Sequence, residues 1–305
     1  MSSQWISALR SVALNLPDLV KAEEFYTEVW RLEVVARDGG AIYMRGTGAD
    51  HHLLSLHQGG DVPQIRHITF RARSEAALKD VANATVAAGG SIAVPLGTLK
   101  DPAGGVGLTL RDQDGRLVQV VCNDKLHSDV LDTKDQPMRL AHVVVNAHDV
   151  PKSQRFFEQA MGFKLVDRTR IMAFMNCNSD HHSLALGDTD NDALNHIAFV
   201  MPELDSVMRG GGRMKDAGHS IEWGPGRHGP GNNAFNYFID PFGVVIEYTA
   251  DVQQIDDNYR VGTPEDWKWP AGRVDHWGIS APPSAKLKEA QRAVFFIPTT
   301  AASGV

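Results

Sequence analysis

Hydrophobic and polar positions follow the same order twice along the chain. The segments Leu9–Trp30 and Leu140–Met161 each begin with an alternating, strand-like run. Each continues through a turn that contains Asp and ends in the pattern of an amphipathic helix. Further on, DHHLLSL at Asp50 matches DHHSLAL at Asp180. Equivalent positions stay about 130 residues apart, which indicates an internal repeat.

The later parts of the repeat predict a second helix and further strands in each half. RHITF at Arg66 matches NHIAF at Asn195, and DGRLVQVV matches the strand-like FGVVIEYT that ends at Thr249. The intervening segments 75–90 and 203–220 predict helices, each with a glycine near its end. One helix per group of strands predicts an α+β fold with two homologous halves. We expect each half to contain two paired βαβββ modules that form a curled sheet around a cavity.

The repeat also predicts the domain boundaries. We expect an N-terminal domain without metal over residues 1–123, a polar linker over 124–137 and a C-terminal catalytic domain over 138–251. Residues 252–305 form an extension rich in aromatic residues, which we expect to cover the mouth of the site or pack on a neighbouring subunit. Within it, residues 284–296 predict a short helix.

Composition excludes several classes of function. The chain has 305 residues, 43% of them hydrophobic and 22% charged, and a net charge of −7. An acidic chain argues against binding to nucleic acid, which requires basic surface. No run of 18 apolar residues predicts a membrane span, and the N-terminal segment does not resemble a signal peptide. The only two cysteines, Cys122 and Cys177, are expected to be reduced core thiols of a cytoplasmic protein.

The second half carries a set of residues typical of a metal site. His142, His196 and Glu247 each lie in the middle of a strand-like segment. Two imidazoles and one carboxylate form the facial set that holds Fe(II) or Mn(II) with open positions. The equivalent residues of the first half are Ser11, His67 and Gln119. We therefore expect one metal ion, held by the second half.

Each of these residues also has a simpler interpretation. A single histidine in a strand is more often a hydrogen-bonded core residue, as we expect for His67. Glu247 would face solvent if the face that it shares with Val245 and Thr249 were half exposed. The metal interpretation therefore depends on finding all three residues at equivalent strand positions of one repeat.

At these residues the chain resembles the type I extradiol ring-cleaving dioxygenases of the vicinal oxygen chelate superfamily. The resemblance covers roughly residues 7–280. It rests on LAHVVVNAHD, DHHSLAL, NHIAF, GRHGPGNNAFNYF, GVVIEYT and the closing Trp277–Gly278. It implies that a catechol ring is cleaved with O₂ at Fe(II), or at Mn(II), bound by His142, His196 and Glu247.

The resemblance also implies roles for other side chains. His182 corresponds to the acid/base that lies outside the metal ligands, and His228 and Tyr237 correspond to the residues that contact the substrate hydroxyls. From the residues alone, His182 could instead cap a turn, Tyr237 could be a packed aromatic and His228 an ordinary loop residue. Phe174 is a further expected substrate contact.

Two positions relate to the choice of substrate. The loop Gly229–Asn233 (GPGNN) and the chain end resemble the homoprotocatechuate branch more than the biphenyl-diol branch. Arg273 lies four residues before Trp277 and implies a contact with a substrate carboxylate, although it also fits a surface ion pair. Trp223 takes the place of the second arginine of that branch and would favour a bulkier or less acidic catechol.

The sequence therefore predicts an extradiol dioxygenase of aromatic catabolism that acts on a catechol and O₂, as a homo-oligomer without nucleic-acid or membrane partners. Two alternatives stay open. One is a metal-dependent isomerase or lyase of the glyoxalase type, and the other is a metal-free protein of the same fold that binds small molecules.

Overall fold

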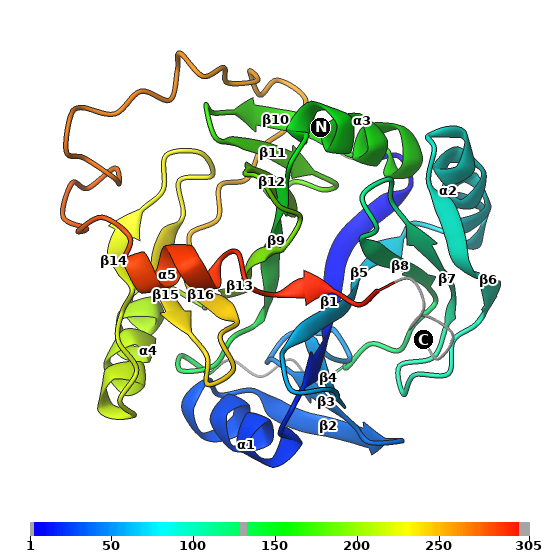
Figure 1. The fold of residues 1–305 in the computed structure, drawn as a ribbon, viewed down its shortest axis with the longest axis horizontal. Coiled ribbons are helices and arrows are strands. Elements are labelled where there is room, and N and C mark those ends of the chain that lie inside the picture. The colour runs from blue at the N-terminus through cyan, green and yellow to red at the C-terminus, as the bar shows by residue number, and fades with distance from the viewer. Residues whose placement is uncertain (1–2, 129–132, 299–305) are drawn as a thin grey trace.

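The computed structural model describes residues 3–128 and 133–298, which form two curled mixed sheets, one from each half of the chain (Figure 1). The first sheet has the order β2-β3-β4-β1-β5-β8-β7-β6, and the second has the order β10-β11-β12-β9-β13-β16-β15-β14. The two orders are equivalent strand by strand, which confirms the predicted α+β class with two homologous halves. A short strand near the C-terminus, β17, also pairs with β5 of the first sheet.

The strands of the first sheet are β1 (Ile6–Leu16), β2 (Glu33–Asp38), β3 (Ala41–Arg45), β4 (Leu54–Gln58), β5 (Gln64–Ala72), β6 (Ser91–Thr98), β7 (Val106–Arg111), β8 (Leu117–Cys122) and β17 (Phe295–Phe296). Those of the second are β9 (Arg139–Ala147), β10 (Lys164–Arg168), β11 (Met172–Asn176), β12 (Leu184–Asp188), β13 (Leu194–Val200), β14 (Trp223–Arg227), β15 (Ala234–Ile239) and β16 (Val245–Ala250). The helices are α1 (Leu19–Glu24), the π-helical η1 (Phe25–Val29), α2 (Glu75–Ala87), α3 (Val150–Met161), α4 (Leu204–Asp216) and α5 (Ala285–Ala290).

Local sequence signals set the ends of the helices. The side chain of Asp149 accepts a hydrogen bond from Lys152 N and caps the start of α3. The predicted glycines after the second helix of each half, Gly89 and Gly218, have φ angles of 86° and 87°, which residues with a side chain rarely adopt. The helix predicted over 284–296 is shorter than expected, since α5 ends at Ala290 and β17 follows it.

The first helical segment of each half packs on strands of its own half and also contacts the other half. Trp30, which follows η1 of the first half, stacks on Tyr248 of β16 with ring centroids 3.6 Å apart. Tyr26 Oη donates to Asp240 Oδ2, at the end of β15, at 2.9 Å. In the reciprocal contact, α3 of the second half lies beside α2 of the first (Figure 1). The halves are therefore interlocked in space although they are consecutive in the chain.

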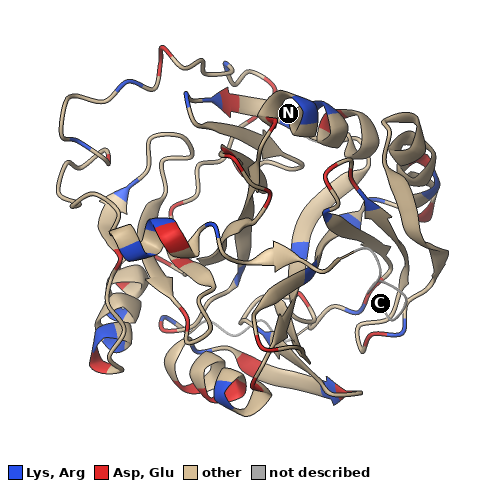
Figure 2. Ribbon diagram, viewed as in Figure 1, with Lys and Arg blue, Asp and Glu red and all other residues tan. Residues whose placement is uncertain are grey.

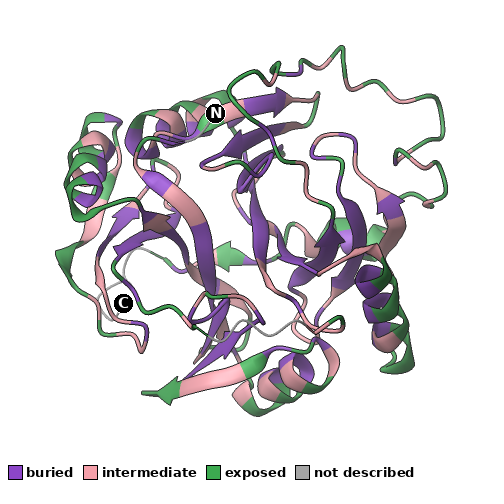
Figure 3. Cartoon of the chain, turned by 180° about the vertical axis from the view of Figure 1, so that it is seen from behind, coloured by how far each residue is buried: buried purple, intermediate pink, exposed green. Residues whose placement is uncertain are grey.

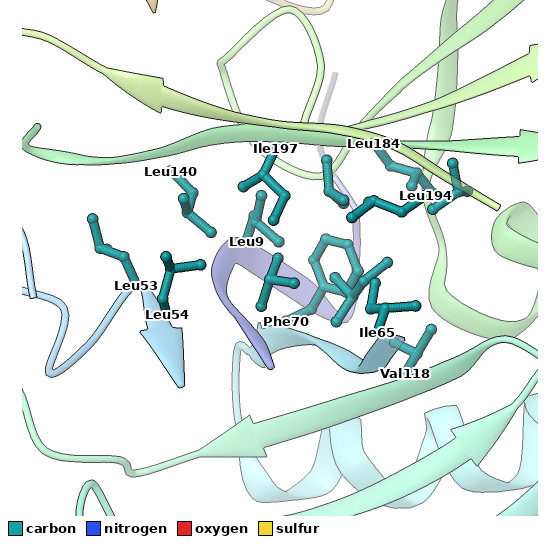
Figure 4. Packing of buried hydrophobic residues seen from close by; sticks show 14 of the residues in the cluster. Leu9, Leu53, Leu54, Ile65, Phe70, Val118, Leu140, Leu184, Leu194 and Ile197 are labelled. Carbon is teal, nitrogen blue, oxygen red and sulfur yellow. The ribbon is translucent and has the colours of Figure 1, made fainter. Parts of the chain in front are cut away.

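One hydrophobic core joins the two sheets. Leu9 and Phe70 of the first half and Leu140 and Ile197 of the second belong to the same buried cluster (Figure 4). The central strands of both sheets are largely buried, whereas the edge strands β2, β6, β10 and β14 and one face of each helix are more exposed (Figure 3). Cys122 and Cys177 are buried and unbridged, which confirms that they are reduced core thiols.

The charged residues are mixed along both halves. In the described part of the chain, basic and acidic positions alternate over the helices and the strand ends (Figure 2). None of the described helices combines the length and apolar character that crossing a membrane requires.

Candidate metal centre

Three neighbouring strands of the second sheet carry the predicted metal ligands. His142 lies on β9, His196 on β13 and Glu247 on β16, and these strands are adjacent in the sheet. In the registers of the two strand pairs, His142 and Glu247 both lie opposite Ala198. Because side chains alternate between the faces of a strand, His196 shares that face. The strand register therefore brings the three side chains together.

The three donor atoms form a nearly equilateral triangle. His142 Nε2, His196 Nε2 and Glu247 Oε2 are 3.3 Å apart in each of the three pairs. Adjacent ligands of an octahedral ion with bonds of about 2.1 Å lie about 3 Å apart. All three side chains are buried, and Glu247 Oε2 accepts no hydrogen bond from the described residues. Since burying a carboxylate oxygen without a donor is costly, these residues fit a divalent cation.

Neighbouring amides hold the ligands in place. His196 Nδ1 donates to Asn195 Oδ1 at 2.8 Å, so the lone pair of this imidazole lies on Nε2, inside the triangle. Asn233 Nδ2 lies 2.7 Å from Thr249 Oγ1 and 3.4 Å from Glu247 Oε1. Asn233 was not predicted from the sequence, because the GPGNN loop was considered only for what it implies about the substrate. Its place beside the loop histidine was the available signal.

Burial changes the proton affinity of the site residues. Burial acts to raise the pKa of Glu247, but contacts with the neighbouring imidazoles outweigh it and hold the pKa well below its usual value. Burial lowers the pKa of His196 to about 4 and the pKa of His182 well below its usual value. Burial and the charge of Glu247 raise the pKa of Tyr237 well above its usual value. At neutral pH Glu247 is therefore a carboxylate and His196 a neutral imidazole, the forms that bind metals.

Predicted substrate contacts line one side of the triangle. Tyr237 Oη, on β15, lies 3.0 Å from His228 Nε2 and 3.4 Å from His196 Nε2. Trp223, on β14, packs against both, with its ring centroid 5.0 Å from Tyr237 and 5.2 Å from His228. The ring of Phe235 stacks on His228 at 4.0 Å. The polar atoms of Tyr237 and His228 thus lie near the candidate ligands, and the rings of Trp223 and Phe235 pack against these two side chains.

His182 and Phe174 lie next to a different ligand. The ring centroid of His182 is 4.2 Å from that of His142 and 5.0 Å from that of Phe174. His182 is buried in the connection between β11 and β12. The site therefore has a further imidazole beside the triangle, on an element separate from the one that carries Tyr237.

Arg273 is the one predicted site residue that the structure leaves apart. It is exposed, and its guanidinium lies against Gly278, where an added Cβ would come within 2.8 Å of Arg273 Nε. Among the described residues, no contact joins Arg273 to the metal ligands. The extension does contact the site's loop elsewhere, because a Cβ on Gly229 would meet Trp269 at 2.7 Å and Trp267 at 3.2 Å.

In the first half a guanidinium lies beside Ser11 and His52, the equivalents of His142 and His182. Arg10 is buried, and its Nη1 lies 2.9 Å from Ser11 Oγ and 2.7 Å from His52 Nε2. Gln119 Oε1 accepts a hydrogen bond from Thr69 at 3.2 Å. These contacts place a positive charge beside Ser11 and His52, and one metal ion per chain stays a prediction.

One further group of acidic residues and histidine has ligand-like spacing. It contains Asp114, His148 and Asp192. Arg116 lies 3.1 Å from Asp114 and 2.6 Å from Asp192, and Lys152 lies 2.5 Å from Asp114. The carboxylates are thus already paired with cationic side chains, unlike Glu247.

Comparison with known proteins places these residues in a family context. The profile of the Glyoxalase/Bleomycin resistance protein/Dioxygenase superfamily matches residues 8–120 and 139–248, one stretch in each half. Metapyrocatechase 2 of Cupriavidus necator is 28% identical over 91% of this chain and 90% of its own length. The manganese-dependent 2,3-dihydroxybiphenyl 1,2-dioxygenase of Geobacillus genomosp. 3 is 24% identical over 77% of this chain and 82% of its own.

Solved structures share the whole architecture. The Mn(II)-bound glyoxalase from Novosphingobium aromaticivorans is 31% identical and has a TM-score of 0.85, over 94% of both chains. The homoprotocatechuate 2,3-dioxygenase from Arthrobacter globiformis is 22% identical with a TM-score of 0.84, over 98% of this chain and 95% of its own. The second likeness bears on the fold alone.

Proposed function

Because the chain belongs to the Glyoxalase/Bleomycin resistance protein/Dioxygenase superfamily, we propose that it is an extradiol dioxygenase. It would cleave the ring of a catechol beside the two hydroxyls and consume O₂. The observation that carries the proposal is the buried triangle of His142, His196 and Glu247, with an unpaired carboxylate oxygen and a separate imidazole, His182, beside it. The curated relatives, which are ring-cleaving dioxygenases by name, support the same reaction.

The two imidazoles and one carboxylate suit Fe(II) and Mn(II), and we propose Fe(II) with Mn(II) as the alternative. Bound there, either ion supplies a Lewis acid and open positions at which a diol and dioxygen meet. His142, His196 and Glu247 would hold the ion. Asn195 keeps the lone pair of His196 directed at it.

The remaining residues would bind the diol and handle its protons. The phenol of Tyr237 keeps its proton, since burial raises its pKa, and can donate a hydrogen bond to a substrate oxygen beside His228. Neutral His182 can accept the proton of a diol hydroxyl and later return it. Trp223 and Phe174 would contact the ring from the two sides of the site.

The test measures metal and dioxygen together. The protein is loaded anaerobically with Fe(II) or Mn(II) and given substituted catechols. O₂ uptake is then followed with the absorbance of the yellow ring-fission product. Equimolar consumption of O₂ and catechol supports the proposal. Bound metal with no O₂ uptake for any catechol contradicts it.

The second candidate is a metal-dependent isomerase or lyase of the glyoxalase type. The similarity to the Mn(II)-bound glyoxalase, at 31% identity over 94% of both chains, favours it. Turnover of a glyoxalase substrate without O₂ consumption would support this candidate instead. A chain that binds a small molecule but no metal would support neither enzyme.

A further inference from the structure

We propose that Asp167 and His181 are positioning residues that fix the tautomer and orientation of His182. The inference rests on the proposed function, in which His182 must accept a proton from the substrate. Asp167 lies on β10, and the two histidines are consecutive in the connection between β11 and β12. Asp167 and His181 are fully buried. They lie behind His182 rather than among the metal ligands.

Asp167 accepts every hydrogen bond that it makes. Its Oδ2 accepts from His181 Nε2 at 2.7 Å and from Tyr259 Oη at 3.0 Å, and its Oδ1 accepts from Gly262 N at 2.7 Å. A carboxylate offers only lone pairs. His181 must therefore carry its proton on Nε2.

This tautomer is transmitted to His182. A neutral His181 that is protonated on Nε2 has a lone pair on Nδ1. His181 Nδ1 and His182 Nδ1 lie 3.0 Å apart, so His182 must donate its Nδ1 proton across this contact. The lone pair of His182 is thereby left on Nε2, where it can accept a proton.

The first half contains the same pair of histidines but a different way of fixing them. His51 Nδ1 and His52 Nδ1 are also 3.0 Å apart. There, Arg10 Nη1 donates a hydrogen bond to His52 Nε2 at 2.7 Å, so the proton of a neutral His52 lies on Nδ1. The strand register places Ala36 opposite Tyr43, just as it places Asp167 opposite Phe174. The first half therefore has no carboxylate at this position.

The difference between the halves explains why only the second half needs a carboxylate at the position of Asp167. In the first half, His52 Nε2 is occupied by a guanidinium and cannot serve a substrate. In the second half, His182 Nε2 must stay free for the substrate. The tautomer of His182 therefore has to be fixed through its other nitrogen, Nδ1. A buried carboxylate on the far side of His181 achieves this without entering the site.

The variant Asp167→Asn tests the inference, because an amide can turn its NH₂ toward His181 and reverse the tautomer. We expect the kcat of the metal-loaded enzyme to fall about 10- to 100-fold, as for other residues that orient site groups. KM and the bound metal should stay within about twofold, since the ligands and the substrate contacts are intact. The matched control is His51→Asn, which alters the equivalent pair in the first half and should leave kcat unchanged.

A second measurement does not depend on catalysis. Long-range ¹H–¹⁵N NMR of the full-length, metal-free chain labelled with ¹⁵N-histidine identifies the protonated nitrogens. The inference requires His181 protonated on Nε2 and His182 on Nδ1 in the wild type, and a reversed pair in Asp167→Asn. The opposite tautomers in the wild type overturn it, as does an unchanged kcat in a variant whose tautomers are reversed. If the tautomers are as expected but no catechol is cleaved, the proposed function fails and the positioning pair stands.

Discussion

The substitution His196→Gln tests the metal centre directly, because His67 provides a matched control. The two histidines hold equivalent positions on β13 and β5. Burial lowers the pKa of His196 to about 4 and that of His67 to about 3. His196 has two partner ligands at 3.3 Å, whereas the equivalents of those partners beside His67 are Ser11 and Gln119. The same substitution should therefore remove metal binding in one half only.

The expected effect follows from linkage between binding and folding. A metal at 100 times its Kd stabilises the native state by about 2.7 kcal/mol. For a chain of this size, that raises Tm by about 5 °C. Losing one of three protein ligands should lower the affinity for the metal at least about 100-fold. This is more than the effect expected for a residue that only orients a ligand. At the same metal concentration the gain in stability then falls to about 0.4 kcal/mol, or under about 1 °C.

The assay compares Tm with and without Mn(II) for the wild type, His196→Gln and His67→Gln, together with metal analysis of each protein. We expect about one ion per chain in the wild type and in His67→Gln. We expect a Tm increment in these two proteins only. Two ions per chain, a full increment in His196→Gln, or loss of the increment in His67→Gln would each refute the reasoning.

Three further outcomes are expected. In His182→Asn, metal content should be retained while kcat falls about 10²- to 10⁴-fold; loss of the metal would make His182 a ligand. Burial raises the pKa of Asp240 to about 6, so the native state binds the carboxyl proton of Asp240 more tightly than the unfolded state does. The free energy of unfolding should therefore decrease by up to about 3 kcal/mol as pH rises from about 4 to about 6. In Asp240→Asn, urea titrations should show a smaller decrease. In Arg273→Ala, KM for carboxylated catechols should stay unchanged, because Arg273 is exposed and apart from the candidate ligands; a rise of about 10- to 100-fold would instead place Arg273 at the substrate carboxylate.

The candidate metal ligands could be found in the sequence because the repeat provides an internal comparison. His142 and Glu247 differ from Ser11 and Gln119 within otherwise similar segments, and strand periodicity is enough to put them on one face. The structure adds the register that brings both opposite Ala198. The interpretation of Glu247 as a half-exposed residue was wrong, since Val245 and Thr249 on its face are also buried.

The contacts of the first helices with the opposite half were not predictable in the same way. The pattern before Trp30 shows that one face of a helix is buried, but not which sheet covers it. Only long-range packing, as in the stack of Trp30 on Tyr248, decides that the end of η1 also meets the other half. Asp167 was missed for a similar reason. Its position in the chain is distant from His181, and only the pairing of β10 with β11 places it behind the double histidine.

The two halves balance charge inside the same fold in different ways. In the first, Arg10 brings a permanent positive charge into the sheet, and Asp124 lies 3.3 Å from it. In the second, Ala141 takes the place of Arg10, and Glu247 leaves an oxygen for an exchangeable cation. A guanidinium fills its position and offers no open site to a ligand, whereas a metal ion held by three residues does. The first half therefore supplies its own cation, whereas the second half leaves a carboxylate oxygen for one that it would have to bind.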